Sequence, residues 1–164
     1  MITVDDVKNL RDKTGVSIMQ CKKALEEAGG DADKALALLK KKGAEIAGKK
    51  GDRTLGAGVV ASYIHASGNV GALVELWCET DFVAKNEEFK ALAKDIAMQV
   101  TATNPEFLSM ADENVSPDDK DRVLLEQAFI KNGEHTVAEM LSNAVQKFGE
   151  KIEIGRFARF ATAR

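Results

Sequence analysis

Apolar residues recur every three or four positions through the first forty residues, which is the spacing of one face of a helix. Gly15 and Gly29-Gly30 divide this stretch into three runs, and Gly43 closes the last run. Each run follows a residue that commonly caps a helix N-terminus: Thr3, Ser17 and Asp31. The pattern predicts three short helices that pack into a small bundle over residues 1–43.

Glycines and charged residues replace this spacing over residues 44–57, which we interpret as a linker, although residues 44–50 also fit a continuation of the third helix. Beyond the linker, apolar residues alternate with polar ones, as in a half-buried strand. We predict strands over 59–65 and 70–78, joined by a hairpin turn at Ala66-Ser-Gly-Asn69.

Four further elements follow from capping residues, proline positions and periodicity. They are a helix from Asn86 to Asn104, a helix from Pro117 to Lys131 after an irregular acidic segment, a helix from Thr136 to Phe148, and a strand over 151–162. The alternation in this last strand slips near Gly155, which indicates a β-bulge. We therefore expect an α+β fold, in which residues 58–164 form a core of one three-stranded antiparallel sheet packed with helices.

The composition is that of a soluble globular protein, with 45% hydrophobic and 30% charged residues. No apolar run approaches the roughly 20 residues that cross a bilayer, and the acidic, helix-like N-terminus does not resemble a signal peptide. We therefore expect a cytoplasmic protein without membrane attachment. Residues 1–53 carry 12 Lys and Arg against 9 Asp and Glu, and residues 54–164 carry 11 against 17, so the larger part is too acidic for general nucleic-acid binding.

The cysteines and histidines do not indicate a disulfide framework, a metal site or a catalytic site. Cys21 and Cys78 do not form a disulfide framework, and together with His65 and His135 they lack the spacing of a metal site. Cys78 lies on the apolar face of a predicted strand, so we interpret it as a buried structural thiol and not as a nucleophile paired with His65. Gly56-Ala-Gly58 lacks the other residues of a phosphate loop. We expect no metal and no cofactor.

A basic cluster marks the end of the third predicted helix and the linker: Lys40–Lys42, Lys49, Lys50 and Arg53. A phosphate-rich partner such as ribosomal RNA would suit these cations. No aromatic residue interleaves with them, as a stacking platform for bases requires. We favour the alternative, a solvated helix end and linker, and expect no specific nucleic-acid partner.

Asp81-Phe82 follow the second predicted strand, where a turn is expected. A Phe exposed at a turn is an anchor that another protein can bury, with a gain of about 1.5–3 kcal/mol. Alternatively, Asp81 caps the turn and Phe82 folds back onto the helix that begins near Asn86. The hydrophobic pattern leaves both interpretations open.

Two segments resemble signatures of the translation elongation factor Ts family. They are Leu10-Arg-Asp-Lys-Thr-Gly-Val-Ser-Ile-Met-Gln-Cys-Lys-Lys-Ala-Leu25 and Glu75-Leu-Trp-Cys-Glu-Thr-Asp-Phe-Val-Ala-Lys85. The resemblance implies that residues 1–43 are a ubiquitin-associated-like (UBA-like) domain. It also implies a guanine-nucleotide exchange factor, which binds the GTPase EF-Tu carrying GDP and promotes GDP release during translation elongation. Such a factor performs no covalent chemistry, so we do not expect an enzyme.

The resemblance also implies which residues meet EF-Tu. Asp81 and Phe82 match the pair that enters the GTPase near its magnesium and phosphate site, within the matched segment Thr80, Asp81, Phe82 and Val83. The wedge formed by Phe82 would displace backbone around the magnesium and loosen GDP. Further possible contacts are implied for five residues: His65, Leu10, Arg11, Thr14 and Gly15.

Three departures from the family pattern bear on function. Trp77 stands where the family usually has Asn, and the region 104–124 looks shorter than in relatives. Many members carry two core modules, whereas this chain has one, as in short relatives that act as homodimers. We therefore expect a homodimer, which an uncovered sheet face or edge would suit.

Two other classes of function compete with this one. A non-catalytic adaptor could use the UBA-like bundle to bind ubiquitin-like or nascent-chain ligands, but it would give Thr80–Val83 no role. A small thiol enzyme would need a base and oxyanion donors, which the sequence pattern does not supply.

Overall fold

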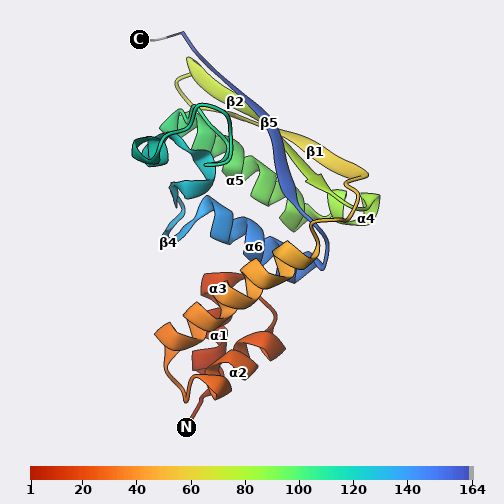
Figure 1. Ribbon diagram of the computed structural model, residues 1–164, viewed down its shortest axis with the longest axis vertical. Coiled ribbons are helices and arrows are strands. Elements are labelled where there is room, and N and C mark those ends of the chain that lie inside the picture. The colour runs from red at the N-terminus through yellow and green to blue at the C-terminus, as the bar shows by residue number, and fades with distance from the viewer. Residues whose placement is uncertain (163–164) are drawn as a thin grey trace. The chain divides into compact units, whose positions relative to one another are not determined.

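The computed structural model describes residues 1–162, and these form two compact units, the first of helices and the second of mixed helix and sheet (Figure 1). The first unit contains Met1–Arg53 together with Glu139–Lys151. The second contains Thr54–Ala138 together with the C-terminal segment from Ile152. The expected α+β class is confirmed. The expected scheme placed residues 139–151 in the core, whereas here they pack with the N-terminal helices; the scheme of separate domains at 1–43 and 58–164 stays a prediction.

Three helices open the first unit: α1 (Val4–Thr14), α2 (Ile18–Glu27) and α3 (Ala32–Lys49). Thr3 caps α1, because its hydroxyl accepts the Asp6 amide at 3.2 Å while the Asp6 carboxylate accepts the Thr3 amide at 2.8 Å. The Asp31 carboxylate caps α3 by accepting two backbone amides at 3.0 Å. The buried faces of the three helices share one small core: Val7, Leu10, Val16, Cys21, Ala24, Leu25, Ala35 and Leu39.

Of the two interpretations of residues 44–50, the continuation of the third helix is confirmed and the helix end at Gly43 is wrong, because α3 continues through Gly43 to Lys49. Gly43 faces α6 (Val137–Phe148) at close range: a Cβ at this position would lie 3.3 Å from the Ser142 Cβ and would collide with the Gln146 amide. The Gln146 side chain donates to the Leu39 carbonyl at 3.1 Å. Gly43 is thus a packing position inside the helix and not a helix end.

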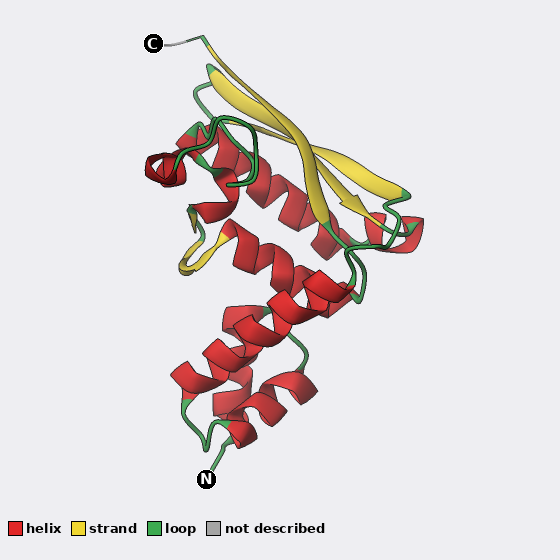
Figure 2. Ribbon diagram, viewed as in Figure 1, coloured by secondary structure: helices red, strands yellow, loops and turns green. Residues whose placement is uncertain are grey.

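The second unit is built on the expected three-stranded antiparallel sheet, drawn in yellow in Figure 2, and the strand order is β1-β2-β5. Its strands are β1 (Ala57–Ile64), β2 (Val70–Cys78) and β5 (Glu153–Ala161). The helix α5 (Glu87–Thr103), capped by Asn86, packs along one face of β1 and β2. The predicted bulge is confirmed, since Gly155 and Arg156 both lie opposite Glu75.

The predicted helix from Pro117 to Lys131 is wrong. Two 3₁₀ helices, η1 (Pro117–Arg122) and η2 (Leu124–Glu126), are followed by a small hairpin of β3 (Ala128–Phe129) and β4 (Asn132–Thr136). Backbone donors that a helix would use internally pair elsewhere: the Leu124 amide donates to the Phe107 carbonyl at 2.8 Å. The buried Gln99 side chain of α5 accepts the Ile130 amide at 2.8 Å and donates to the Ala128 carbonyl at 3.1 Å. These long-range bonds favour the hairpin over a helix.

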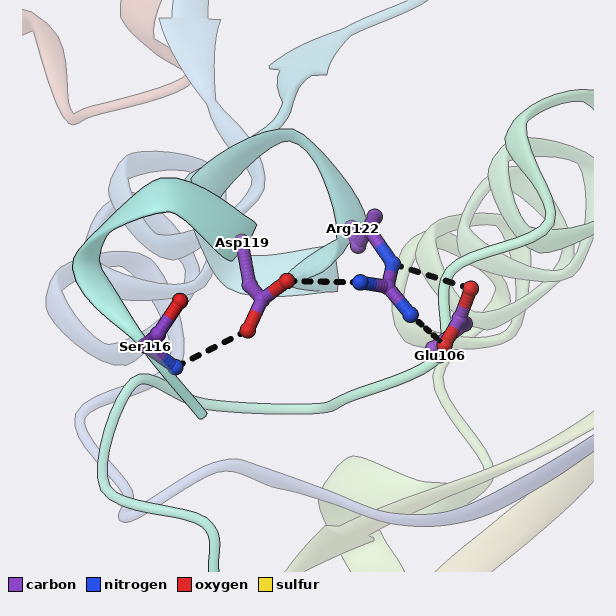
Figure 3. Close-up of polar contacts among 4 residues, drawn as sticks. All are labelled: Glu106, Ser116, Asp119 and Arg122. Carbon is purple, nitrogen blue, oxygen red and sulfur yellow. Dashed lines mark hydrogen bonds and ion pairs between the residues drawn. The ribbon is translucent and has the colours of Figure 1, made fainter. Parts of the chain in front are cut away.

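The Arg122 side chain stabilises this irregular segment through contacts with Glu106 and Asp119 (Figure 3). Its guanidinium forms a bidentate pair with Glu106 and donates to Asp119 at 2.6 Å, and it also lies over the Phe107 ring at 5.6 Å. Asp119 in turn accepts the Ser116 amide at 2.9 Å. This amide, followed by the Ser116 hydroxyl and Arg122, holds the pKa of Asp119 below its usual value. The network joins the two ends of residues 106–122.

Candidate functional site

A single helical turn, α4 (Asp81–Ala84), follows β2 and presents the Asp-Phe pair. Thr80 caps it, with its hydroxyl 3.5 Å from the Val83 amide that it accepts. The inward side of the turn is filled by Val83 and Ala84, which are 4% and 6% exposed. Asp81 and Phe82 lie on the outward side, and Phe82 is 85% exposed. The alternative in which Phe82 folds back onto the following helix is therefore not adopted.

The position of α4 depends on contacts from the sheet. The buried Cys78 thiol donates to the Thr80 carbonyl at 3.3 Å, at the point where the chain leaves β2. Gly56 allows the chain before β1 to pass the same corner, since a Cβ there would lie 3.2 Å from the Glu79 carbonyl oxygen. The turn is thus held against the sheet at Cys78 and by its buried Val83 and Ala84, while the Phe82 side chain stays in water.

His65 lies at the opposite end of the β1–β2 hairpin from α4. Ala57 pairs with Cys78 at one end and Ile64 with Gly71 at the other, a separation of roughly 23 Å at 3.3 Å per residue. This distance rules out a hydrogen-bonded pair of Cys78 and His65, which the thiol-enzyme hypothesis would need. A partner that contacts both Phe82 and His65 must span the length of the hairpin.

The exposed His65 ring is oriented by the turn that follows it. The Ser67 amide donates to Nδ1 at 3.2 Å, and the Ser67 hydroxyl lies 2.9 Å from the same nitrogen. Since Nδ1 accepts a hydrogen bond, the neutral ring carries its proton on Nε2. His65 therefore presents a donor that a partner can bind.

The four candidate residues of the first signature separate into buried and exposed groups. Leu10 and Thr14 are each 3% exposed, and the Thr14 hydroxyl donates to the Leu10 carbonyl at 2.8 Å. Gly15 ends α1 in the left-handed region at φ 69°, with its amide bonded to the Arg11 carbonyl at 2.7 Å. Arg11 is exposed. Of these four, Arg11 has the side chain most accessible to a partner, and the other three shape the fold around it.

Arg11 also lines a groove that we did not predict, with a volume of about 720 Å³. Its walls come from the start of the chain, α1 and α2, and they are mostly apolar with a basic rim: Ile2, Thr3, Val4, Val7, Lys8, Arg11, Ile18, Lys22 and Glu26. Ile18 shares helical spacing with the buried Cys21 and Leu25, yet it is 60% exposed. Met19, beside it, is 80% exposed. The adjacent apolar residues Ile18 and Met19 at the start of the helix were the sequence signal for an exposed apolar surface, because one helix face cannot bury both side chains.

The basic cluster is partly neutralised within the first unit. Lys40 pairs with Glu139 at 3.1 Å and Lys42 with Glu27 at 2.9 Å. Lys50 donates to the Gly149 carbonyl at 2.8 Å. Cations that are already paired release fewer counterions on meeting a phosphate chain, which supports the structural interpretation of the cluster.

Residues 1–162 contain no group of three His, Cys, Asp or Glu side chains placed to hold a metal ion. None of the helices in this described part is both long and apolar enough to cross a lipid bilayer. The candidate features for binding a partner are the Asp81–Phe82 turn, His65 and the α1–α2 groove.

Comparison with known proteins gives a consistent result along the chain. The family model described as Elongation factor TS matches residues 17–119 and 79–164. A protein named Elongation factor Ts from Carboxydothermus hydrogenoformans is 43% identical over 192 positions, which cover 98% of this chain and 88% of the relative. The protein of that name from Desulforamulus reducens is 41% identical over 191 positions (97% and 88%), and that from Syntrophomonas wolfei is 43% identical over 192 (98% and 90%). These aligned spans exceed 164 residues, so the relatives contain residues with no counterpart here.

Proposed function

Because the chain belongs to the elongation factor Ts family, we propose that it binds EF-Tu carrying GDP and promotes GDP release during translation elongation. It acts as an exchange factor in the cytoplasm and carries out no covalent chemistry. The observation that carries this proposal is the 85% exposure of Phe82 on a turn whose other side is anchored in the core. A large apolar side chain held in water can anchor a complex by binding in an apolar pocket of the partner.

The proposed mechanism is a wedge. Phe82 enters an apolar pocket of the nucleotide domain of EF-Tu, and Asp81 accompanies it toward the magnesium and phosphate site. Burying one Phe side chain contributes about 1.5–3 kcal/mol. That energy is available only when the pocket opens, so the factor binds the nucleotide-free GTPase more tightly than the GDP state. By linkage, GDP is then held less tightly by the same factor.

The N-terminal unit supplies a second contact in this proposal. Its groove has an apolar floor and three cationic side chains on the rim, Lys8, Arg11 and Lys22. Such a surface favours an amphipathic, acidic helix of the partner GTPase. We assign the groove and Arg11 to docking and the Asp81–Phe82 turn to exchange.

A homodimer forms part of the same proposal. The sheet face opposite α5 carries exposed apolar side chains from all three strands, including Val60, Leu73 and Phe160. An interface between two copies of this face would remove these side chains from water.

Stopped-flow release of a fluorescent GDP analogue from EF-Tu tests the exchange function. We expect release to become faster with rising concentration of this protein. No acceleration at a stoichiometric excess would reject the proposal. Binding to EF-Tu without faster release would instead favour the adaptor function, in which the N-terminal groove alone recruits the partner.

A further inference from the structure

Asn132 precedes Gly133, and it is the one asparagine in the sequence that a glycine follows. The side-chain carbonyl carbon of an asparagine can be attacked by the backbone nitrogen of the next residue, which closes a five-membered succinimide ring. A side chain on that next residue hinders the approach, and glycine has none. The sequence therefore offers a single position at which this ring closure meets the least steric resistance.

Both residues lie at the start of β4, directly after the turn of the small hairpin. Asn132 is half-buried and Gly133 is exposed, so water reaches the peptide between them. The antiparallel register pairs Phe129 with Asn132 and Ala128 with Thr136, so Gly133 lies in the bulged stretch between these two pairs. The backbone there can adjust toward a ring more readily than it could inside a regular ladder.

The Asn132 side chain is turned forward along the chain. The Glu134 amide donates to Asn132 Oδ1 at 3.3 Å, so the carboxamide curls over the peptide that joins Asn132 to Gly133. The Gly133 nitrogen approaches Cγ from this side. The same hydrogen bond draws electron density from the carbonyl, and it stabilises the negative charge that develops on Oδ1 while the ring closes. One backbone amide thus both orients and activates the reacting carbon.

We propose that Asn132 is a site of spontaneous modification in the folded protein, where the carboxamide is converted to a carboxylate without an enzyme. The Gly133 nitrogen forms a bond to Cγ, its proton passes through water to the leaving nitrogen, and the Cγ–Nδ2 bond breaks to release ammonia. Water then opens the succinimide at Cγ, which gives aspartate, or at the backbone carbonyl carbon, which gives isoaspartate. Water is consumed, ammonia is released, and nothing is oxidised or reduced.

The two products differ in their effect on the hairpin. Both make the formal net charge of −3 one unit more negative. Isoaspartate also lengthens the backbone of β4 by a methylene, because the chain then runs through the former side chain of Asn132. Gln99 of α5 binds both sides of the adjacent turn, at the Ile130 amide (2.8 Å) and the Ala128 carbonyl (3.1 Å). A longer backbone disturbs this geometry, so the isoaspartate form should be less stable than the aspartate form.

Peptide mass spectrometry of the folded full chain, incubated at mildly alkaline pH, tests the proposal. We expect residue 132 to become a mixture of aspartate and isoaspartate. Gly133→Ala is the matched control and should convert at least tenfold more slowly. It is compatible with the fold, because Gly133 lies outside the left-handed region and its Cβ would meet no described atom within 4 Å outside its chain neighbours. Asn104 is an internal control, since the nitrogen of Pro105 carries no hydrogen to lose.

Conversion of residue 132 only in urea-unfolded protein would overturn the proposal, because β4 would then protect the peptide. Equal rates in wild type and Gly133→Ala, or aspartate as the sole product, would indicate direct hydrolysis and overturn the ring closure. Asn132→Asp carries the new charge without the longer backbone. The isoaspartate fraction of the wild type, separated by chromatography, should therefore melt at a lower temperature than Asn132→Asp. Equal melting temperatures would overturn the predicted effect on the hairpin.

Discussion

Phe82 and Val83 are neighbours in the chain, yet α4 places one in water and the other in the core, at 85% and 4% exposure. The two side chains therefore separate binding from stability. We expect Phe82→Ala to leave the free energy of unfolding within about 0.5 kcal/mol of the wild type, as is usual for surface positions. The same change should slow the GDP release from EF-Tu that this protein stimulates by roughly ten- to a hundredfold. The reason is that the complex loses the burial of the Phe82 side chain, which contributes about 1.5–3 kcal/mol.

Val83→Ala is the matched control for that prediction. It creates a cavity under α4 and should lower the free energy of unfolding by about 1–2 kcal/mol. Thermal unfolding and stopped-flow nucleotide release measure the two effects. A large loss of stability in Phe82→Ala would show that its ring packs against its own domain.

Gly43→Ala tests the packing of α3 on residues 139–148. Alanine is favoured over glycine inside a helix by about 1 kcal/mol, but here its Cβ meets Ser142 and Gln146. We expect a net destabilisation, measured by denaturant unfolding. Gly48→Ala in the same helix is the control, because no atom lies within 4 Å of its Cβ and it should stabilise the protein. Stabilisation by both changes would contradict the proposed close approach.

Gln99→Leu tests the buried amide that fixes the β3–β4 hairpin. The change removes the hydrogen bonds to the Ile130 amide and the Ala128 carbonyl, and each such bond contributes about 0.5–1.5 kcal/mol. We expect a lower melting temperature and faster hydrogen exchange at the Ile130 amide. Unchanged exchange there would mean that the hairpin holds its conformation without Gln99.

The Asp119 network should loosen in acid. The pKa of Asp119 is lowered in the folded protein, first by the Ser116 amide, so its stabilising effect is complete above the pKa of the unfolded chain, about 3.9. The effect is lost as the pH falls through the lower folded pKa. The Ser116 amide resonance should follow this titration in NMR spectra.

Asp119→Asn should remove most of the pH-dependent change in the chemical shift of the Ser116 amide. Asp118→Asn, at the neighbouring carboxylate outside the network of Figure 3, should leave it in place. A Ser116 resonance that titrates identically in both variants would contradict the assignment.

Local signals in the sequence predicted much of the fold. The caps Thr3, Asp31 and Asn86 and the hairpin at residues 66–69 depend on residues a few positions apart, and each appears as expected. The slip near Gly155 was also visible, because alternation is a property of the strand itself. Such features need no knowledge of distant partners.

The errors arose where distant residues decide the local structure. In the sequence Gly43 resembles a helix end. In the structure it packs against Ser142, about a hundred positions later, where a larger side chain would come too close. Residues 117–131 have helical composition, but some of their backbone amides donate hydrogen bonds to the Gln99 side chain and the Phe107 carbonyl instead of to a helix. At the candidate site, the Asp81–Phe82 turn was found from its motif, whereas the α1–α2 groove was missed, because a concave surface depends on how two helices pack.

The order of the sheet has a consequence for the newborn chain. The central strand β2 gains its second neighbour only when β5 has been synthesised, some eighty residues later, and the first unit likewise waits for residues 139–151. Contacts of such long range slow folding. A chain whose synthesis stops before residue 139 therefore leaves both units unfinished, with one edge of β2 unpaired and the N-terminal helices without α6.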